Sequence, residues 1–287
     1  MSFSNTFKNI IQHIEVDGDV SQPRDLKVKE SILSNFVINP KQPIVDFPQR
    51  KFNWKYLAGE MAWYLKQDRD VDYIGNFSNF WSRITNPDTN EINSNYGSLV
   101  FNKEQFGWVI DSLEQDKNSR QAIMFFNSPK FQFEGNKDFV CTMYANFFIR
   151  HNILHMKVQM RSNDIFYGLT FDAPFFAFLQ QSVFLKLKET YPDLELGMYY
   201  HFADNLHFYE RHFELATEIQ GHDVDITKEH TFMLKQPFLE YDGKNVTLSD
   251  SAQAFINEID ESIDNDAIKT KQDYKDILDK YFVTNGE

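Results

Sequence analysis

The chain has very little cysteine: Cys141 is the only one among 287 residues. A single cysteine excludes an internal disulfide and a cysteine-rich zinc site, and it fits a reducing compartment. No stretch reaches the roughly 18 to 20 apolar residues of a membrane span. The first five residues also lack the basic region and apolar run of a secretory signal. We therefore expect a cytoplasmic protein that has no membrane partner.

Basic charge is scarce as well. The chain carries 29 Lys and Arg against 42 Asp and Glu, which gives a formal net charge of −13. Such a surface repels polyanions, so stable nucleic-acid binding is not expected, and a small phosphate would need a local cluster of Arg. The 8 His residues show no ligand spacing such as His-Glu-x-x-His, so we predict no metal site.

Internal repeats, low-complexity tracts and clear linkers are absent too. With 42% hydrophobic residues the chain has enough apolar material for one large core. We predict a single domain over residues 1–287, in which the periodic pattern weakens over residues 222–287.

Hydrophobic periodicity predicts helices mixed with strands. The first half of the chain predicts helices over residues 53–67, which include Glu60, and 104–116, and a β-hairpin of strands 138–149 and 153–161. On this pattern Cys141 shares a face with Met143, Ala145 and Phe147. Glu60 lies either beside the apolar stripe of its helix or on a solvated flank. The acidic stretch 257–266 is most simply a solvated face.

The second half continues in the same way, which indicates an α+β fold with a mixed sheet and packed helices. The predicted elements are a helix over 173–191, entered just after Asp172, a strand over 198–202, a helix from about 207 to before Gly221, a strand over 231–234, and helices over 251–263 and 272–282.

One group of residues suggests covalent chemistry. Cys141 precedes the segment Met160-Arg161-Ser162-Asn163-Asp164 by some twenty residues. A sulfur nucleophile, an anion-binding Arg-Ser pair and a carboxylate are the parts that a covalent enzyme acting on a phosphorylated small molecule needs. Taken singly, the cysteine would be read as a buried inert thiol, and each arginine as a surface charge.

In residue type, order and spacing, these motifs resemble the thymidylate synthase family over roughly residues 20 to 215. Three passages are closest to the deoxycytidylate (dCMP) hydroxymethylases of T-even-like bacteriophages: residues 91–97 (EINSNYG), 138–142 (DFVCT) and 160–164 (MRSND). Further matches upstream and downstream are Arg24, residues 59–65 (GEMAWYL), Trp81, residues 119–120 (SR), residues 168–172 (GLTFD) and residues 207–209 (HFY).

The resemblance implies a role for each matched residue. Cys141 is the nucleophile that adds to C6 of a pyrimidine nucleoside monophosphate, and 5,10-methylenetetrahydrofolate is the cofactor that supplies a methylene group to C5. Glu60 relays protons, and Asp172 contacts the base. The positions matched to substrate binding are Arg24, Arg120, Arg161, Ser162, Asn163, His207 and Tyr209. The positions matched to cofactor binding are Trp81, Tyr96, Asp164 and Gly168.

The resemblance also implies a homodimer in which Arg120 reaches the phosphate site of the partner subunit. The family usually has a second Arg after this position, and Gln121 stands there instead. At Asp172 thymidylate synthase has Asn, which pairs with uracil. A carboxyl group instead accepts from the N4 amino group of cytosine and shares a proton with N3. Without the resemblance, Asp172 would be read as a helix N-cap.

The expected activity is therefore folate-dependent 5-hydroxymethylation of dCMP by a phage-type enzyme in the host cytoplasm. The alternatives are methylation or hydroxymethylation of dUMP or CMP and, from another class, a non-catalytic nucleotide-binding protein. The C-terminus, Val283-Thr284-Asn285-Gly286-Glu287, lacks the short apolar ending of thymidylate synthases. Looser closure there would admit water, which favours a hydroxymethyl product.

Overall fold

A mixed β-sheet organises the fold. The computed structural model describes residues 2–50, 52–86, 89–221, 230–264 and 270–284. The strand order is β1-β2-β7-β5-β4-β3, with β6 paired to β7. The pairs β5–β7 and β6–β7 are parallel, and the other pairs of this sheet are antiparallel. Its strands are β1 (Asp19–Ser21), β2 (Val28–Ile38), β3 (Ile123–Phe125), β4 (Thr142–Arg150), β5 (Ile153–Met160), β6 (Asn163–Asp164) and β7 (Glu195–Tyr209). The predicted α+β class with a mixed sheet is confirmed.

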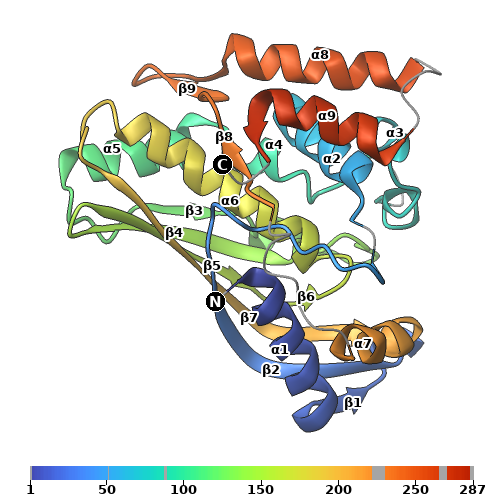
Figure 1. The fold of residues 1–287 in the computed structure, drawn as a ribbon. Helices are drawn as coiled ribbons and strands as arrows, with labels where there is room; N and C mark the ends of the chain where they lie inside the picture. The colour runs from blue at the N-terminus through green and yellow to red at the C-terminus, as the bar shows by residue number, and fades with distance from the viewer. Residues whose placement is uncertain (1, 51, 87–88, 222–229, 265–269, 285–287) are drawn as a thin grey trace.

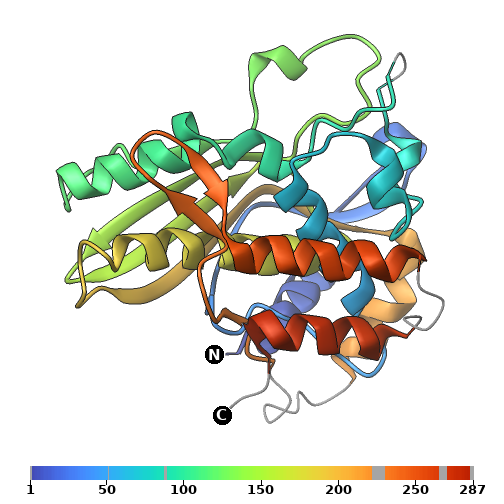
Figure 2. The ribbon, with the colours of Figure 1, turned by 90° about the horizontal axis from the view of Figure 1, so that it is seen from above.

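Helix α6 packs along one face of this sheet, and α8 and α9 lie beyond it, beside α2 (Figures 1 and 2). Nearly every side of α6 is apolar, including Phe175, Phe176 and Phe178, because the helix is buried between these layers. The helices are α1 (Phe3–Asp17), α2 (Trp54–Lys66), α3 (Val71–Gly75), α4 (Tyr96–Val100), α5 (Trp108–Gln115), α6 (Leu169–Leu187), α7 (Phe213–Gln220), α8 (Asp250–Asp264) and α9 (Lys271–Tyr281). Within the described ranges, no helix is both long and apolar enough to cross a membrane.

The predicted β4–β5 hairpin is confirmed, and it turns at His151 and Asn152, whose φ angles of 52° and 62° are left-handed. Strand β4 begins at Thr142, so Cys141 lies one residue before it. A register shift between Thr142 and Tyr144 also changes the alternation. The expectation that Cys141 shares the face of Ala145 is therefore wrong, because the bulge places Thr142 in the buried series instead.

Two predicted boundaries around the site are wrong. Helix α6 begins at Leu169 rather than after Asp172, and its N-cap is Gly168, so Asp172 lies in the first turn. The segment from His207 continues a strand instead of beginning a helix, and α7 starts only at Phe213. Strand β7 is long because β2 pairs with it from Tyr199 to Tyr209. Tertiary pairing thus overrides the local pattern.

The predicted helices over 53–67, 251–263 and 272–282 are confirmed by α2, α8 and α9, and a π-helical turn (Lys103–Gly107) with α5 covers the one over 104–116. The described part after residue 229 joins the same core, where Phe232 stacks on Phe282 with ring centroids 4.3 Å apart. Its short strands are β8 (Met233–Leu234), β9 (Leu239–Tyr241), β10 (Val246–Leu248) and β11 (Phe282–Val283).

The acidic stretch 257–266 is not simply a solvated face. Asp260 pairs with Lys66 of α2 at 2.8 Å, so part of the stretch fixes α8 against the core. Residues 265 and 266 lie outside the described residues, as do the last three residues of the chain.

Candidate active site

Cys141 lies in a short loop that Arg161 holds from the end of β5. The Arg161 guanidinium donates to the carbonyl oxygens of Phe139 and Val140, and its Nη2 lies 3.5 Å from the Cys141 Sγ. The Arg161 backbone N–H donates to the Cys141 carbonyl at 2.9 Å. Arginine is suited to this task because its planar fork presents several donors at once. The sequence-predicted pair of nucleophile and Arg is therefore brought together.

The Cys141 thiol experiences opposing effects. Burial raises its pKa, the positive charges of Arg161 and Arg24 lower it, and Asp172 and Asp138 raise it. The net pKa lies above the ordinary value, so the arginines offset burial only in part. A dianionic ligand in this loop would raise the pKa of the thiol further, and a cationic ligand would lower it.

Arg24 lies in a turn just before β2, toward the opposite edge of the sheet from β4. Arg24 and Asp25 both have left-handed backbones, with φ of 52° and 61°. Such conformations are strained for non-glycine residues and are found most often where a side chain must be aimed. The charge of Arg24 acts on Cys141, His207 and Tyr209, which places it beside all three. Ser162, half-buried, directly follows Arg161.

In the structure, Arg120 lies apart from the group around Cys141. It is exposed, between α5 and β3, and makes no hydrogen bond or ion pair with the described part of the chain. None of the pKa effects at Cys141 comes from Arg120. Its position is thus not part of the cluster within one subunit.

Asp172 faces the cluster from the first turn of α6. Asn163 Nδ2 donates to Asp172 Oδ2 at 2.7 Å. Burial raises the pKa of Asp172 to about 6, and the hydrogen bond from Asn163 opposes that rise. A Cβ at Gly168 would lie 2.7 Å from Asn163 Nδ2 and 2.8 Å from the Asp164 carbonyl oxygen. Gly168 therefore leaves the room that this pair needs.

Glu60 is buried, which corrects the alternative of a solvated flank. Tyr56 OH donates to Glu60 Oε1 at 2.7 Å, and Trp81 Nε1 donates to Tyr56 OH at 3.0 Å. Burial raises the pKa of Glu60 to about 8, the hydrogen bond from Tyr56 lowers it, and the charge of Asp172 raises it. Trp81, predicted to contact the cofactor, is thereby tied to the predicted proton relay.

The remaining predicted residues border the same space. Tyr96 is buried, and its hydroxyl accepts from Thr142 Oγ1 at 2.8 Å. It lies close enough to Asp172 and Cys141 for their charges to raise its pKa, in addition to the effect of burial. Asp164 lies opposite His207 in the parallel β6–β7 pair, and its Oδ1 accepts from the Phe166 and Tyr167 backbone N–H groups at 2.8 and 3.3 Å. The His207 and Tyr209 rings meet edge to face at 5.3 Å.

Sequence reasoning missed several residues that adjoin the site. Arg50 is half-buried and donates to the Phe166 carbonyl and Thr170 Oγ1, and desolvation lowers its pKa to about 10. Asp138 accepts from Ser94 N at 2.7 Å and from Ser94 Oγ at 2.5 Å, which anchors the start of the loop that carries Cys141. Asp138 stands in the matched passage 138–142, but no role was predicted for it.

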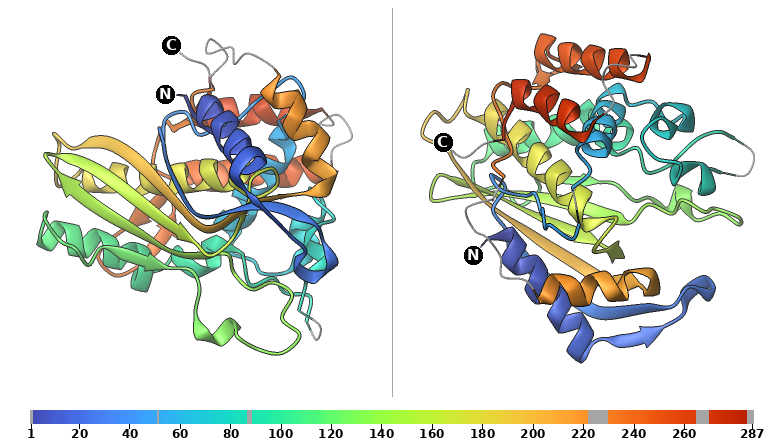
Figure 3. Two further views of the ribbon diagram at one scale, coloured as in Figure 1. Left: turned by 90° about the horizontal axis from the view of Figure 1, so that it is seen from below. Right: turned by 45° about the vertical axis from the view of Figure 1, so that its right-hand side comes forward.

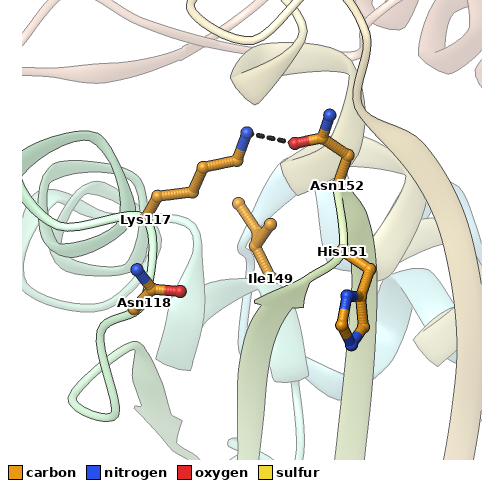
Figure 4. Close-up of a pocket in the computed structure, with 5 residues that line it drawn as sticks. All are labelled: Lys117, Asn118, Ile149, His151 and Asn152. Carbon is orange, nitrogen blue, oxygen red and sulfur yellow. Dashed lines mark hydrogen bonds between the residues drawn. The ribbon is translucent and has the colours of Figure 1, made fainter.

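A surface pocket elsewhere is separate from this cluster. It is lined by Lys117, Asn118, Ile149, His151 and Asn152, and Lys117 donates to Asn152 (Figure 4). The pocket lies at the far end of β4 from Cys141, about 30 Å away for a strand of this length. Over the described residues, no cluster of His, Cys, Asp and Glu could hold a metal ion.

Comparisons with known proteins agree with the predicted resemblance. The deoxycytidylate 5-hydroxymethyltransferase of Enterobacteria phage T6 is 30% identical over 174 residues, which cover 57% of this chain and 70% of that protein. The deoxyuridylate hydroxymethyltransferase of Bacillus phage SP01 is 27% identical over 229 residues, 71% of this chain and 56% of that protein. The solved structure of thermostable thymidylate synthase A from Bacillus subtilis has a TM-score of 0.65 at 19% identity. It covers 82% of this chain and 88% of its own, and it supports the fold alone. Residues 5–250 match the model of the thymidylate synthase family, so the chain belongs to that family.

Proposed function

We propose that the chain is a folate-dependent dCMP 5-hydroxymethyltransferase of a phage-type pathway. As a member of the thymidylate synthase family it is a one-carbon transferase. The observation that carries the cytosine assignment is Asp172, a half-buried carboxyl group with a pKa of about 6 that lies within electrostatic reach of Cys141.

Asp172 suits cytosine because of its protonation state. Near neutral pH a carboxyl group with this pKa exchanges a proton readily, so it can accept from the N4 amino group and give a proton to N3. Asn163 holds one carboxyl oxygen, and its own buried Oδ1 has no partner among the described residues, so it is available to a ligand. Protonating the ring draws electrons from C6 and helps a thiolate add there.

The Cys141 thiolate would form the bond to C6, which makes C5 nucleophilic. When bound, methylenetetrahydrofolate would supply a methylene group to C5 and leave as tetrahydrofolate, while C5 loses its proton. Glu60 would then take a proton from a water that adds to this carbon, and the Cys141–C6 bond would break, so that the thiolate leaves and the ring is restored. The raised pKa of Glu60, about 8, means that its ionised fraction is more basic than an ordinary carboxylate and that it exchanges a proton near neutral pH.

The residues near the cluster fit a folate. Asp164 Oδ1 is occupied by two backbone N–H groups, while Oδ2 takes no hydrogen bond from the described chain. A free carboxylate oxygen matches the N–H donors of a pterin ring. Trp81, Tyr96 and Gly168 line the approach in this proposal, although the indole N–H of Trp81 is already used by Tyr56.

A homodimer completes the phosphate site in this proposal. Seen from below (Figure 3, left), β4, β5 and the first half of β7 lie in front of α6, and no helix drawn there covers them. This face exposes Phe125, Met198 and Tyr200, at 54%, 43% and 37%. A second copy packed against it would bury these side chains and carry its exposed Arg120 toward the partner's Arg24, Arg161 and Ser162.

Mixing two inactive variants tests this arrangement. If Arg120 serves the partner's site, Cys141→Ala and Arg120→Ala subunits form mixed dimers with one intact site. Random exchange then restores about one quarter of the wild-type activity. A mixture that stays inactive after verified subunit exchange would show that Arg120 does not act across the interface.

The proposed reaction is tested by product mass. The protein is incubated with methylenetetrahydrofolate and each of dCMP, dUMP and CMP, and hydroxymethylated dCMP is expected as the main product. Methylated dUMP as the sole product would overturn the proposal. Asp172→Asn is expected to shift the preference toward dUMP, because its amide donates where the carboxylate accepted. The masses also distinguish a methyl from a hydroxymethyl product.

Two controls address the remaining alternatives. A non-catalytic nucleotide-binding protein would keep its function in Cys141→Ala, whereas the enzyme loses turnover and keeps nucleotide binding. Truncation after Phe282 tests the role of the C-terminus in admitting water. An unchanged ratio of hydroxymethyl to methyl product would count against that role.

A further inference from the structure

Two side chains on neighbouring strands hold the His207 ring. Asn205 Nδ2 donates to Glu30 Oε2 at 2.7 Å, and the distance from His207 Nδ1 to Asn205 Oδ1 is 2.9 Å. Glu30 lies opposite His207 in the antiparallel β2–β7 pair, and Asn205 precedes His207 by two residues on β7. The three polar groups therefore form one chain of hydrogen bonds across the two strands.

The direction of each hydrogen bond in this chain is fixed by chemistry. An ionised Glu30 can only accept, so the NH₂ group of Asn205 must face it. The Asn205 carbonyl oxygen then faces His207, and since that oxygen also only accepts, Nδ1 must carry a hydrogen. In a neutral imidazole this leaves Nε2 without a hydrogen, so that Nε2 is an acceptor.

The surroundings of His207 favour its neutral form. Burial and the charge of Arg24 lower its pKa, Asp164 and Glu30 raise it, and the net pKa lies below the ordinary value. The backbone of His207 is held on both sides, because β2 pairs along one edge and Ile165 N donates to the His207 carbonyl at 2.9 Å on the other. Nε2 takes no hydrogen bond from the described residues.

We propose that Glu30 and Asn205 are positioning residues that fix His207 as the Nδ1–H tautomer and so require a hydrogen-bond donor from the ligand at Nε2. In the proposed function, on which this inference rests, that donor is the 3′-hydroxyl of the nucleotide sugar, which the family resemblance already assigns to His207 and Tyr209; the positioning by Glu30 and Asn205 is the new element. A nucleotide that lacks this hydroxyl, or carries it as a phosphate ester, presents no donor. The site therefore selects nucleotides whose 3′-hydroxyl is free to donate.

The tautomer is read without any substrate, from long-range ¹H–¹⁵N spectra of the histidine-labelled protein at pH 7.5, with His207→Gln used for assignment. His207 is expected as Nδ1–H with a bare Nε2. His155 is an internal control of opposite sense, because its Nδ1 accepts from Met198 N at 3.1 Å and its hydrogen must lie on Nε2. A hydrogen on Nε2 of neutral His207 would overturn the inference, whatever base the enzyme modifies.

Two variants test the positioning. Asn205→Ala removes the acceptor that requires a hydrogen on Nδ1, so the Nε2–H form becomes populated. Glu30→Gln lets the Asn205 amide adopt either orientation, so a mixture of tautomers is expected. Glu210→Gln is the matched control, since Glu210 lies at the same end of the strand pair and accepts from Lys27 instead. It should leave the His207 spectrum unchanged.

Binding connects the tautomer to selection. Calorimetric titration with dCMP and with its 3′-O-methyl ether, whose oxygen accepts but cannot donate, should show about a tenfold or larger preference for dCMP in the wild type, since the ether offers no donor to Nε2. In Asn205→Ala this ratio should fall, because the Nε2–H form donates to either oxygen. An unchanged ratio in that variant, together with an unchanged spectrum, would refute a positioning role. The same pair of sugars on uracil separates this outcome from a wrong base assignment.

Discussion

The buried carboxyl group of Glu60 leads to a specific prediction of how the stability of the protein depends on pH. Burial raises its pKa from 4.5 to about 8, and each unit corresponds to about 1.4 kcal/mol. Because the folded pKa is the higher one, the unfolded chain loses its proton first as pH rises. The contribution of Glu60 to native stability is therefore most favourable below pH 4.5 and is lost progressively up to about pH 8.

Glu60→Gln removes this titration and keeps an oxygen that accepts from Tyr56. The variant should match the wild type near pH 4 and gain about 3 kcal/mol in unfolding free energy at pH 7, because pH 7 lies about 2.5 pH units above the ordinary pKa of 4.5. Urea unfolding followed by tryptophan fluorescence at several pH values measures this difference. Activity should fall in the same protein, since functional sites often retain destabilising groups.

Glu258→Gln is the matched control. Glu258 also accepts from a tyrosine, Tyr281 at 2.6 Å, but it is half-buried and paired with Lys280. It keeps contact with water, so no comparable gain is expected. A Glu60→Gln variant that gained the same stability at pH 4 and pH 7, or gained none at either, would refute the account of Glu60 as a buried carboxyl group.

Further predictions concern the same cluster. Tyr56→Phe deletes the hydroxyl that donates to Glu60, so the pKa of Glu60 should rise by about 1 unit or more. The acidic limb of the pH–rate profile should then move to higher pH, and an unmoved limb would contradict this prediction. Gly168→Ala places a Cβ 2.7 Å from Asn163 Nδ2, so the KM for the substrate should rise and the unfolding free energy should fall by about 1–3 kcal/mol. A variant with the KM and the unfolding free energy of the wild type would argue against this crowding. Cys141, the only cysteine, has a raised pKa, so alkylation of the free enzyme by iodoacetamide should be slow at pH 7 and accelerate beyond pH 9; rapid alkylation at pH 7 would show that the arginines dominate.

The sequence by itself determined which chemical groups the site contains. The motifs around Cys141, Arg161 and Asp172 could be recognised because each one keeps its residue types within a short segment. Long amphipathic helices such as α2, α8 and α9 were also predictable, because their apolar spacing is set locally.

Only the tertiary structure decided how these groups are connected. Strand β7 extends through His207 because β2 pairs with it, and no local pattern encodes a partner that precedes it by almost 180 residues. The bulge after Thr142 likewise displaces Cys141 from the face that simple alternation predicted. The contacts of Glu30 with Asn205, and of Tyr56 with Trp81, depend on the same long-range packing. Residue chemistry is local in the sequence, whereas pKa values, tautomers and strand lengths depend on neighbours that folding brings together.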